Sequence, residues 1–147
     1  MPTHIALAAI AGFLMPLQAL INARTAAVVG GTFWPTFINF TGGTIAIALA
    51  ALVMRVPPPA TEQIARIPWY GWLSGLLGLI FVAQAAHSIP KLGAATMMSL
   101  IVAGQLIGSL FFDRFGVLQE AQPLTWDKLA GVGLLVAGVF LILRPDR

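Results

Sequence analysis

The sequence predicts an all-α polytopic membrane protein whose chain crosses the bilayer five times. Of its 147 residues, 59% are hydrophobic and only 9% are charged, whereas a soluble domain is typically about 25% charged. Uncharged stretches also recur along the chain, most of them at the length of roughly 20 residues that a helix needs to cross a membrane. A soluble protein of this size could not cover its surface with so few charges, so lipid is the solvent that suits the chain.

The five expected helices form a single transmembrane domain over residues 1–147. The proline-rich stretch 56–68 predicts an exposed loop, and the short turn at 90–93 makes the third and fourth helices antiparallel neighbours. The fifth helix has the shortest uncharged stretch, but the flanking Lys128 and Arg144 can extend to the interface. The expected helices occupy about 4–29, 33–54, 68–89, 92–112 and 127–144.

Lysine and arginine divide evenly between the two sides of such a five-helix protein. Because these residues set membrane orientation, an even division favours dual topology, in which copies insert both ways and pair as an antiparallel homodimer. Chance balance between small numbers is the alternative. If the fifth helix does not span, Arg144 and Arg147 change sides and the count becomes six against two. The four-against-four division sets Arg55, Arg66, Arg114 and Lys128 against Arg24, Lys91, Arg144 and Arg147.

The first helix carries two amides at membrane depth, where polar side chains are candidates for function. Gln18 and Asn22 are four residues apart and therefore share one helix face. Pro16 precedes them, removes a backbone donor and typically kinks a helix. This arrangement suits the wall of a polar cavity, but the two amides could equally hold helices together through hydrogen bonds.

The fourth helix places Gln105 near its centre, between Gly104 and Gly108. A Gly-x-x-x-Gly spacing lets a neighbouring backbone approach closely, so we expect these glycines to pack against another helix. In an antiparallel homodimer two copies of Gln105 would lie at similar depth and could face one shared site. A hydrogen bond to a neighbouring helix is the alternative. Gly71 and Gly75, with Gly78, predict helix packing in the third helix.

The third helix ends with Gln84 and His87. An imidazole there could titrate near neutral pH and couple protons to transport, or it could simply be hydrated. We find no nucleophile–base pair, metal-ligand cluster or phosphate loop, so we expect neither enzymatic activity, nor a metal, nor a cofactor. The chain has no cysteine and no basic run, which leaves disulfides, thiolate metal sites and nucleic-acid binding without support.

Several segments, in order, resemble the YdcZ-like family of small bacterial inner-membrane proteins within the drug/metabolite transporter superfamily. These are PLQALINAR, FINFTGGTIAI, PWYGWLSGLLGLIFV, PKLGAATMMSLIVAGQLIGSLFFDRFG and LAGVGLLVAGVFLI. The resemblance implies five helices per chain, equivalent to half of a ten-helix transporter and completed by antiparallel homodimerisation. It implies transport of a small metabolite across the bacterial inner membrane. Its candidate cavity residues are Gln18, Asn22, Asn39, Gln84 and Gln105.

One departure from the superfamily bears on the substrate. Its small multidrug exporters use an acidic residue in the first helix, whereas IALAAIAGFLMPLQALIN contains none. Neutral or zwitterionic metabolites, which amides can bind, are therefore better expectations than cationic drugs. We expect a small-molecule transporter that acts by alternating access as a dual-topology antiparallel homodimer in lipid. A small dual-topology ion channel and a flippase for lipid-linked substrates are the alternatives.

Overall fold

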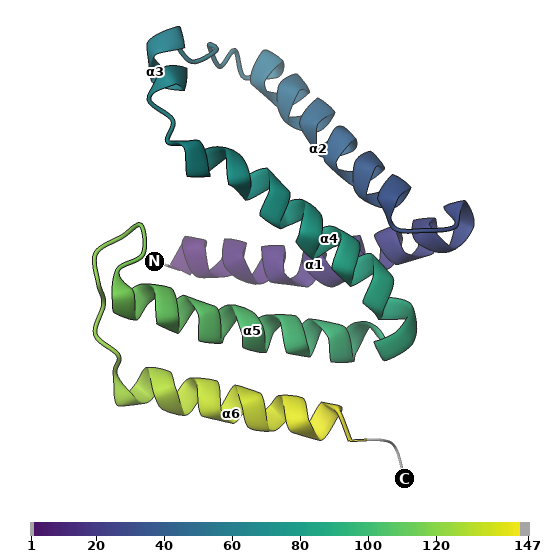
Figure 1. The fold of residues 1–147 in the computed structure, drawn as a ribbon, viewed down its shortest axis with the longest axis vertical. Helices are drawn as coiled ribbons and strands as arrows, with labels where there is room; N and C mark the ends of the chain where they lie inside the picture. The colour runs from purple at the N-terminus through teal and green to yellow at the C-terminus, as the bar shows by residue number, and fades with distance from the viewer. Residues whose placement is uncertain (1, 145–147) are drawn as a thin grey trace. The chain divides into compact units, whose positions relative to one another are not determined.

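The computed structural model describes residues 2–144 and is all helical there (Figure 1). The predicted all-α class is confirmed. Two short elements interrupt the connection between the second and third long helices: α3 (Thr61–Ala65) and the 3₁₀ turn η1 (Trp69–Trp72). The long helices are α1 (Pro2–Val29), α2 (Phe33–Val53), α4 (Leu73–Leu92), α5 (Ala94–Phe115) and α6 (Trp126–Ile142).

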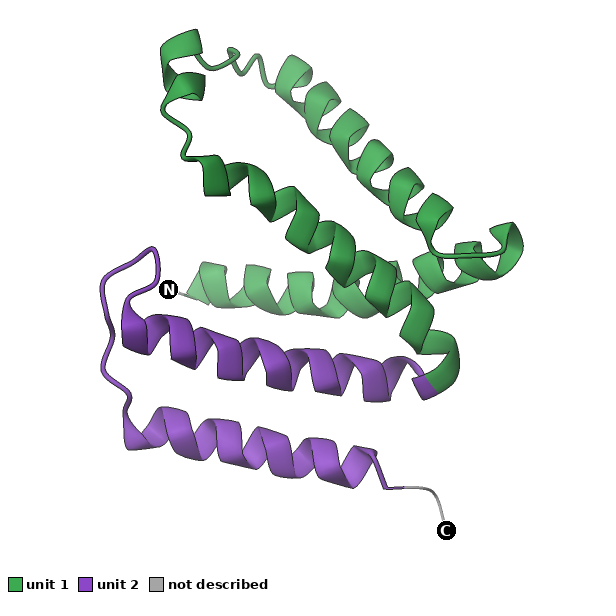
Figure 2. Ribbon diagram, in the orientation of Figure 1, with its two compact units in different colours: residues 1–91 green, residues 92–147 purple. Residues whose placement is uncertain are grey.

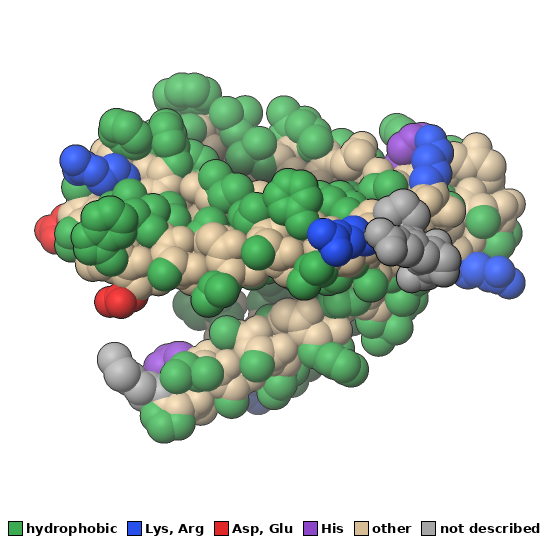
Figure 3. Space-filling model, turned by 90° about the horizontal axis from the view of Figure 1, so that it is seen from below, with side chains coloured by type: hydrophobic (Ala, Val, Ile, Leu, Met, Phe, Trp, Pro, Cys, Tyr) green, Lys and Arg blue, Asp and Glu red, His purple; other side chains and the backbone are tan. Residues whose placement is uncertain are grey.

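Four helical segments of the described chain are long and apolar enough to cross a membrane. Large apolar side chains are exposed on all of them; Phe13 and Leu52, for example, are 79% and 74% exposed. A helix that is hydrophobic all round belongs in a core or a membrane, and here most of these side chains have no protein cover. Figure 3 shows one face of the molecule as mostly hydrophobic, with few charged side chains. The four spans are Pro2–Val29, Phe33–Val53, Trp69–Leu92 and Ala94–Phe115.

The fifth expected span is present as the helix α6, which has 17 residues. At 1.5 Å per residue it is about 26 Å long, slightly less than the hydrocarbon core of roughly 30 Å. Lys128 lies in its first turn, and Arg144 follows its end, so both side chains can extend toward headgroups. The five-span topology stays a prediction, and Arg147, which enters the charge count, lies outside the described residues.

The chain forms two compact units, residues 1–91 and residues 92–147 (Figure 2). In the first unit α1 packs against α2, and in the second α5 packs against α6. The single domain expected over residues 1–147 stays a prediction.

The α1–α2 hairpin closes through Gly30 and Gly31, whose φ angles are +77° and +149°. Both backbone N–H groups donate to the Ala26 carbonyl, at 3.0 and 3.1 Å, and end α1. Glycine adopts such positive φ angles without the steric penalty of other residues. The two helices meet near this turn and diverge away from it (Figure 1). Burial follows the same pattern, since Asn22 and Thr36 are buried near the turn, whereas every residue of α2 from Phe40 to Ala50 is exposed.

The expected loop at 56–68 is exposed but not entirely irregular. Three consecutive prolines at 57–59 leave this stretch without backbone N–H donors, and α3 begins two residues later, at Thr61. The Gln63 side-chain oxygen accepts a hydrogen bond from the Ala60 backbone N–H at 2.9 Å. This is the second half of a capping box, and Ala60 has no side-chain oxygen to supply the first.

Gly116 ends α5 in the left-handed conformation, with a φ of +63°. A Cβ at this position would lie 3.1 Å from both the Ala121 nitrogen and the Gln119 oxygen. The loop folds back against α5, because the Gln122 backbone N–H donates to the Asp113 carbonyl at 2.8 Å. Both the backbone angle and the available space therefore require glycine here.

We expect Gly116→Ala to lower the free energy of unfolding by about 1–2 kcal/mol, the usual penalty of a left-handed L-residue. Circular dichroism during titration of detergent-solubilised protein with dodecyl sulfate would measure the change. Gly133→Ala is the matched control, since a Cβ there meets nothing within 4 Å. Equal midpoints for the two variants would contradict the prediction.

Candidate functional site

Three amides join α1 to α2. Gln18 Nε2 donates to Asn39 Oδ1 at 2.8 Å, and Asn22 Nδ2 donates to the same oxygen at 3.4 Å. Asn22 is buried, Asn39 is half-buried and Gln18 is exposed. We call Gln18, Asn22 and Asn39 the amide cluster.

The hairpin explains why these side chains meet. Asn22 lies eight residues before Gly30, and Asn39 lies eight residues after Gly31. In two antiparallel helices joined at that turn, such positions lie at the same distance from the turn along the hairpin. Gln18 lies one turn further along the same face of α1 as Asn22, so both α1 amides can reach one side chain of α2.

The amide cluster retains most of its hydrogen-bonding capacity. Three primary amides carry six N–H donors and three carbonyl oxygens, and the two hydrogen bonds use two donors and one oxygen. A polar group left unpaired in hydrocarbon costs several kcal/mol, so the remaining groups favour water or a polar solute beside them. The hydrogen bonds hold α1 to α2, as one sequence-based alternative expected, and the cavity role stays a prediction.

Pro16 lies within α1, two residues before Gln18, and the helix continues on both sides of it. Because proline has no backbone N–H, the carbonyl four residues earlier, on Gly12, has no helical donor. A Cβ at Gly12 would meet nothing within 4 Å. α1 therefore has a backbone carbonyl without a helical donor in the turn before the amides.

Gln84 and His87 make their hydrogen bonds within α4, not with the amide cluster. Gln84 Nε2 donates to the Ser88 hydroxyl at 2.8 Å. His87 Nε2 lies 3.0 Å from Lys91 Nζ, and because an ammonium can only donate, the imidazole nitrogen is the acceptor. His87 is exposed, and its role in proton coupling stays a prediction.

Gln105 belongs to the second unit, on α5, and is exposed. None of the side-chain hydrogen bonds within residues 2–144 involves it. A Cβ at Gly104 would meet nothing within 4 Å, and at Gly108 it would meet only Phe112 of the same helix, at 3.8 Å. Within the described part of the second unit, this glycine pair and the Gln105 amide therefore have no partner on another helix.

The glycines of the third expected helix differ from one another. A Cβ at Gly71 would lie 3.0 Å from Ile67 Cγ2, whereas a Cβ at Gly75 would meet nothing within 4 Å. At Gly78 it would lie 3.3 Å from the Phe40 ring of α2. Within the first unit, the absence of a side chain at Gly78 therefore leaves space for the Phe40 ring to pack close to α4.

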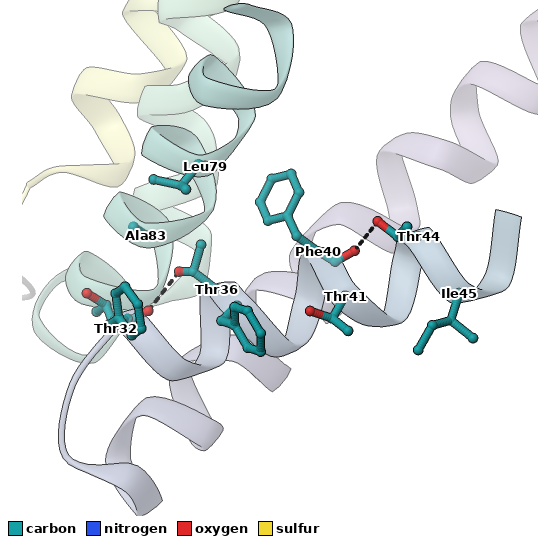
Figure 4. A pocket seen from close by; sticks show the side chains of 10 residues that line it. Thr32, Thr36, Phe40, Thr41, Thr44, Ile45, Leu79 and Ala83 are labelled. Atoms are coloured by element: carbon teal, nitrogen blue, oxygen red, sulfur yellow. Dashed lines mark hydrogen bonds between the residues drawn. The ribbon is translucent and has the colours of Figure 1, made fainter. Parts of the chain in front are cut away.

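An apolar groove of about 520 Å³ lies between α2 and α4 (Figure 4), and sequence reasoning missed it. Its threonines add little polarity, because Thr36 Oγ1 and Thr44 Oγ1 donate to the carbonyls of Thr32 and Phe40, at 2.7 and 2.8 Å. Aromatic residues three and four apart on one face of α2 were a signal for it, but such a face is also typical of lipid contact. The groove is lined by Thr32, Phe33, Thr36, Phe37, Phe40, Thr41, Thr44, Ile45, Leu79 and Ala83.

A family model described as "Putative inner membrane exporter, YdcZ" matches residues 3–141. The chain belongs to this family. The predicted resemblance to the YdcZ family is thus confirmed, over a range that includes all five long helices except the first residue of α1 and the last residue of α6. Family membership and the four apolar helices make the chain a multi-pass inner-membrane protein, as expected. The description of the family names transport out of the cell, and not a catalysed reaction.

A curated relative also carries the YdcZ name, and it matches a shorter part of the chain. The "Inner membrane protein YdcZ" of Escherichia coli strain K12 is 34% identical over 83 residues, which are 56% of this chain and 56% of that protein. The match therefore spans about half the length of the relative. No solved structure matches the chain.

Proposed function

We propose that the chain exports a small neutral or zwitterionic solute by alternating access, as a dual-topology antiparallel homodimer. The observation that carries the proposal is the amide cluster, an uncharged polar site with spare donors and acceptors in a membrane hairpin. Uncharged amides can bind the hydroxyl, carboxylate and ammonium groups of such solutes without a buried charge of their own. Membership of an exporter family supports transport as the purpose of this site.

Two features support the homodimer. Gly104 and Gln105 have no partner within the described part of the second unit, and a second copy could supply one for each. Lysine and arginine divide four against four if α6 spans, which leaves no charge bias to orient the chain. Two inverted copies would give the inverted-repeat architecture of many transporters, with sites near the midplane where the repeats meet.

Efflux from proteoliposomes tests the proposal. The purified chain would be reconstituted into vesicles loaded with a mixture of zwitterionic amino acids and neutral sugars, and mass spectrometry would measure the solutes released. We expect saturable release of a subset of the mixture, absent from protein-free vesicles. Release that does not saturate would instead indicate the channel, and no release of any solute would contradict the proposed substrate class.

We expect Gly104→Ile to dissociate the homodimer without unfolding the chain. The added side chain has room within the second unit, because a Cβ there meets nothing within 4 Å, but it would block close approach of a second backbone. Light scattering in mild detergent would measure the mass of the complex. Gly131→Ile, at an equally open position of α6, is the matched control, and an unchanged mass for Gly104→Ile would contradict the proposed interface.

A further inference from the structure

Two basic residues of α4 follow the residues by which this helix lines the apolar groove between α2 and α4. Leu79 and Ala83 line the groove from α4, and His87 and Lys91 follow them at intervals of four residues. Residues four apart lie above one another on a helix, so these four form one slowly turning stripe. From the aliphatic Ala83 to the basic Lys91 the stripe runs for eight residues, about 12 Å at 1.5 Å per residue.

The basic end of the stripe has no acidic residue to neutralise it within the first unit. Glu62 is the only carboxylic side chain among residues 2–91, and it lies on α3, beyond the opposite end of α2. Thr32, at the start of α2, lines the groove together with Ala83 and makes no side-chain capping bond. Within the first unit, Lys91 thus provides a positive charge without an acidic partner, and Thr32 provides a hydroxyl at the start of α2.

The dimensions of the groove suit a hydrocarbon chain. From Thr32 to Ile45 the lining follows α2 for 13 residues, about 20 Å at 1.5 Å per residue. One leaflet contributes about half of the roughly 30 Å hydrocarbon core. Phe33, Phe37 and Phe40 line the groove with aromatic rings, and Figure 4 shows the Phe40 ring among the lining side chains. A groove of this length, which starts at a helix end, therefore matches a lipid tail entering from the headgroup level.

We propose that this groove is a binding site for an anionic phospholipid. One acyl chain lies along the aromatic face of α2, and the phosphate group contacts the Lys91 ammonium, which the hydrogen bond to His87 Nε2 holds in place. Basic side chains at the membrane surface attract anionic lipids, and here the apolar groove adds a fixed position for the tail. The groove differs from the amide cluster in its residues, because none of Gln18, Asn22 and Asn39 lines it.

Trp34 offers a reporter for this site. Its ring centroid lies 5.4 Å from that of Phe33 and 5.8 Å from that of Phe37, and both phenylalanines line the groove. A variant that retains only Trp34 would carry Trp69→Phe, Trp72→Phe and Trp126→Phe. It would be reconstituted in mixed vesicles of phosphatidylglycerol and phosphatidylcholine in which one of the two lipids has brominated acyl chains. Quenching of Trp34 fluorescence then measures which lipid occupies the groove.

We expect brominated phosphatidylglycerol to occupy the site about fivefold more favourably than brominated phosphatidylcholine, as one interfacial lysine provides. Lys91→Gln should remove this preference, whereas the control Lys128→Gln, on α6, should retain it. Ala83→Phe should fill the groove and reduce quenching by both lipids, whereas Ala137→Phe, at an exposed position of α6, should not. Equal quenching by the two lipids, or a preference that survives Lys91→Gln, would overturn the proposal. Quenching that Ala83→Phe leaves unchanged would also overturn the proposal. That result is expected if a second copy of the chain covers the groove.

Discussion

Asn39→Ala is expected to reduce solute efflux by about tenfold or more. The substitution removes the oxygen that accepts hydrogen bonds from both Gln18 and Asn22. It leaves two amide groups of α1 without their partner, and an unsatisfied buried polar group costs about 1–3 kcal/mol. It also removes the Asn39 N–H donors that remain available to a solute. Efflux of the amino-acid and sugar mixture from proteoliposomes would measure the effect.

Two comparisons separate a binding role from a purely structural one. Gln122→Ala removes an amide from the exposed loop before α6 and should leave efflux unchanged. Asn39→Ala protein should keep its mass in detergent and its helical circular dichroism, because α1 and α2 also pack through Ala19, Ala23 and Pro35. Efflux within twofold of the unmodified protein would show that the amide cluster is not part of the transport site. Gln105→Ala is expected to reduce efflux similarly, through the site that two copies would share.

A variant whose loop charges favour one orientation is expected to lose solute efflux when it is expressed alone. Two variants with opposite charge biases are expected to regain efflux when they are expressed together. Pro58→Lys with Pro59→Lys raises the count on one side from four to six, whereas Arg66→Gln with Arg114→Gln lowers it from four to two. Each variant should then insert in a single orientation, because lysine and arginine in short loops favour the cytoplasmic side. A population with one orientation cannot form an antiparallel pair, but the two variants together can.

Orientation can be measured directly, because the chain has no cysteine. Ala60→Cys places a single thiol in the exposed loop before α3, where a membrane-impermeant reagent can label intact cells before and after permeabilisation. We expect about half of the otherwise unmodified copies to be labelled from outside. The two charge variants should shift this fraction toward opposite extremes. Labelling from one side only, without any added charge, would exclude the dual-topology homodimer.

The sequence predicted those features that depend on the chemistry of single residues. The apolar stretches predicted the four confirmed spans, because a helix in lipid must satisfy its own backbone. The spacing of Gln18 and Asn22 placed both on one face, and the structure gives them a shared partner in Asn39. The bond from Gln84 to Ser88 also follows from their spacing of four residues, although the sequence reasoning overlooked it.

Other features depend on how helices are placed, and a single sequence does not specify that. The groove between α2 and α4 was missed because Phe33, Phe37 and Phe40 fit a lipid-facing surface equally well. Gly78 accommodates Phe40 from another helix, which only the tertiary structure reveals. Gly71 and Gly104 follow the same sequence pattern, yet a Cβ would be crowded at one and meet open space at the other. Small residues permit close packing, but they do not identify the neighbour.

The unequal lengths of the helices make the chain sensitive to the thickness of its host membrane. α1 has 28 residues and α6 has 17, so no single bilayer thickness matches both if α6 spans as predicted. In that topology a thicker membrane would strain the region around α6, whereas a thinner one would require α1 to tilt further, each at a fraction of a kcal/mol per Å. The acyl-chain length of the lipids is therefore a variable to control whenever the protein is expressed in another bacterium or reconstituted in synthetic bilayers.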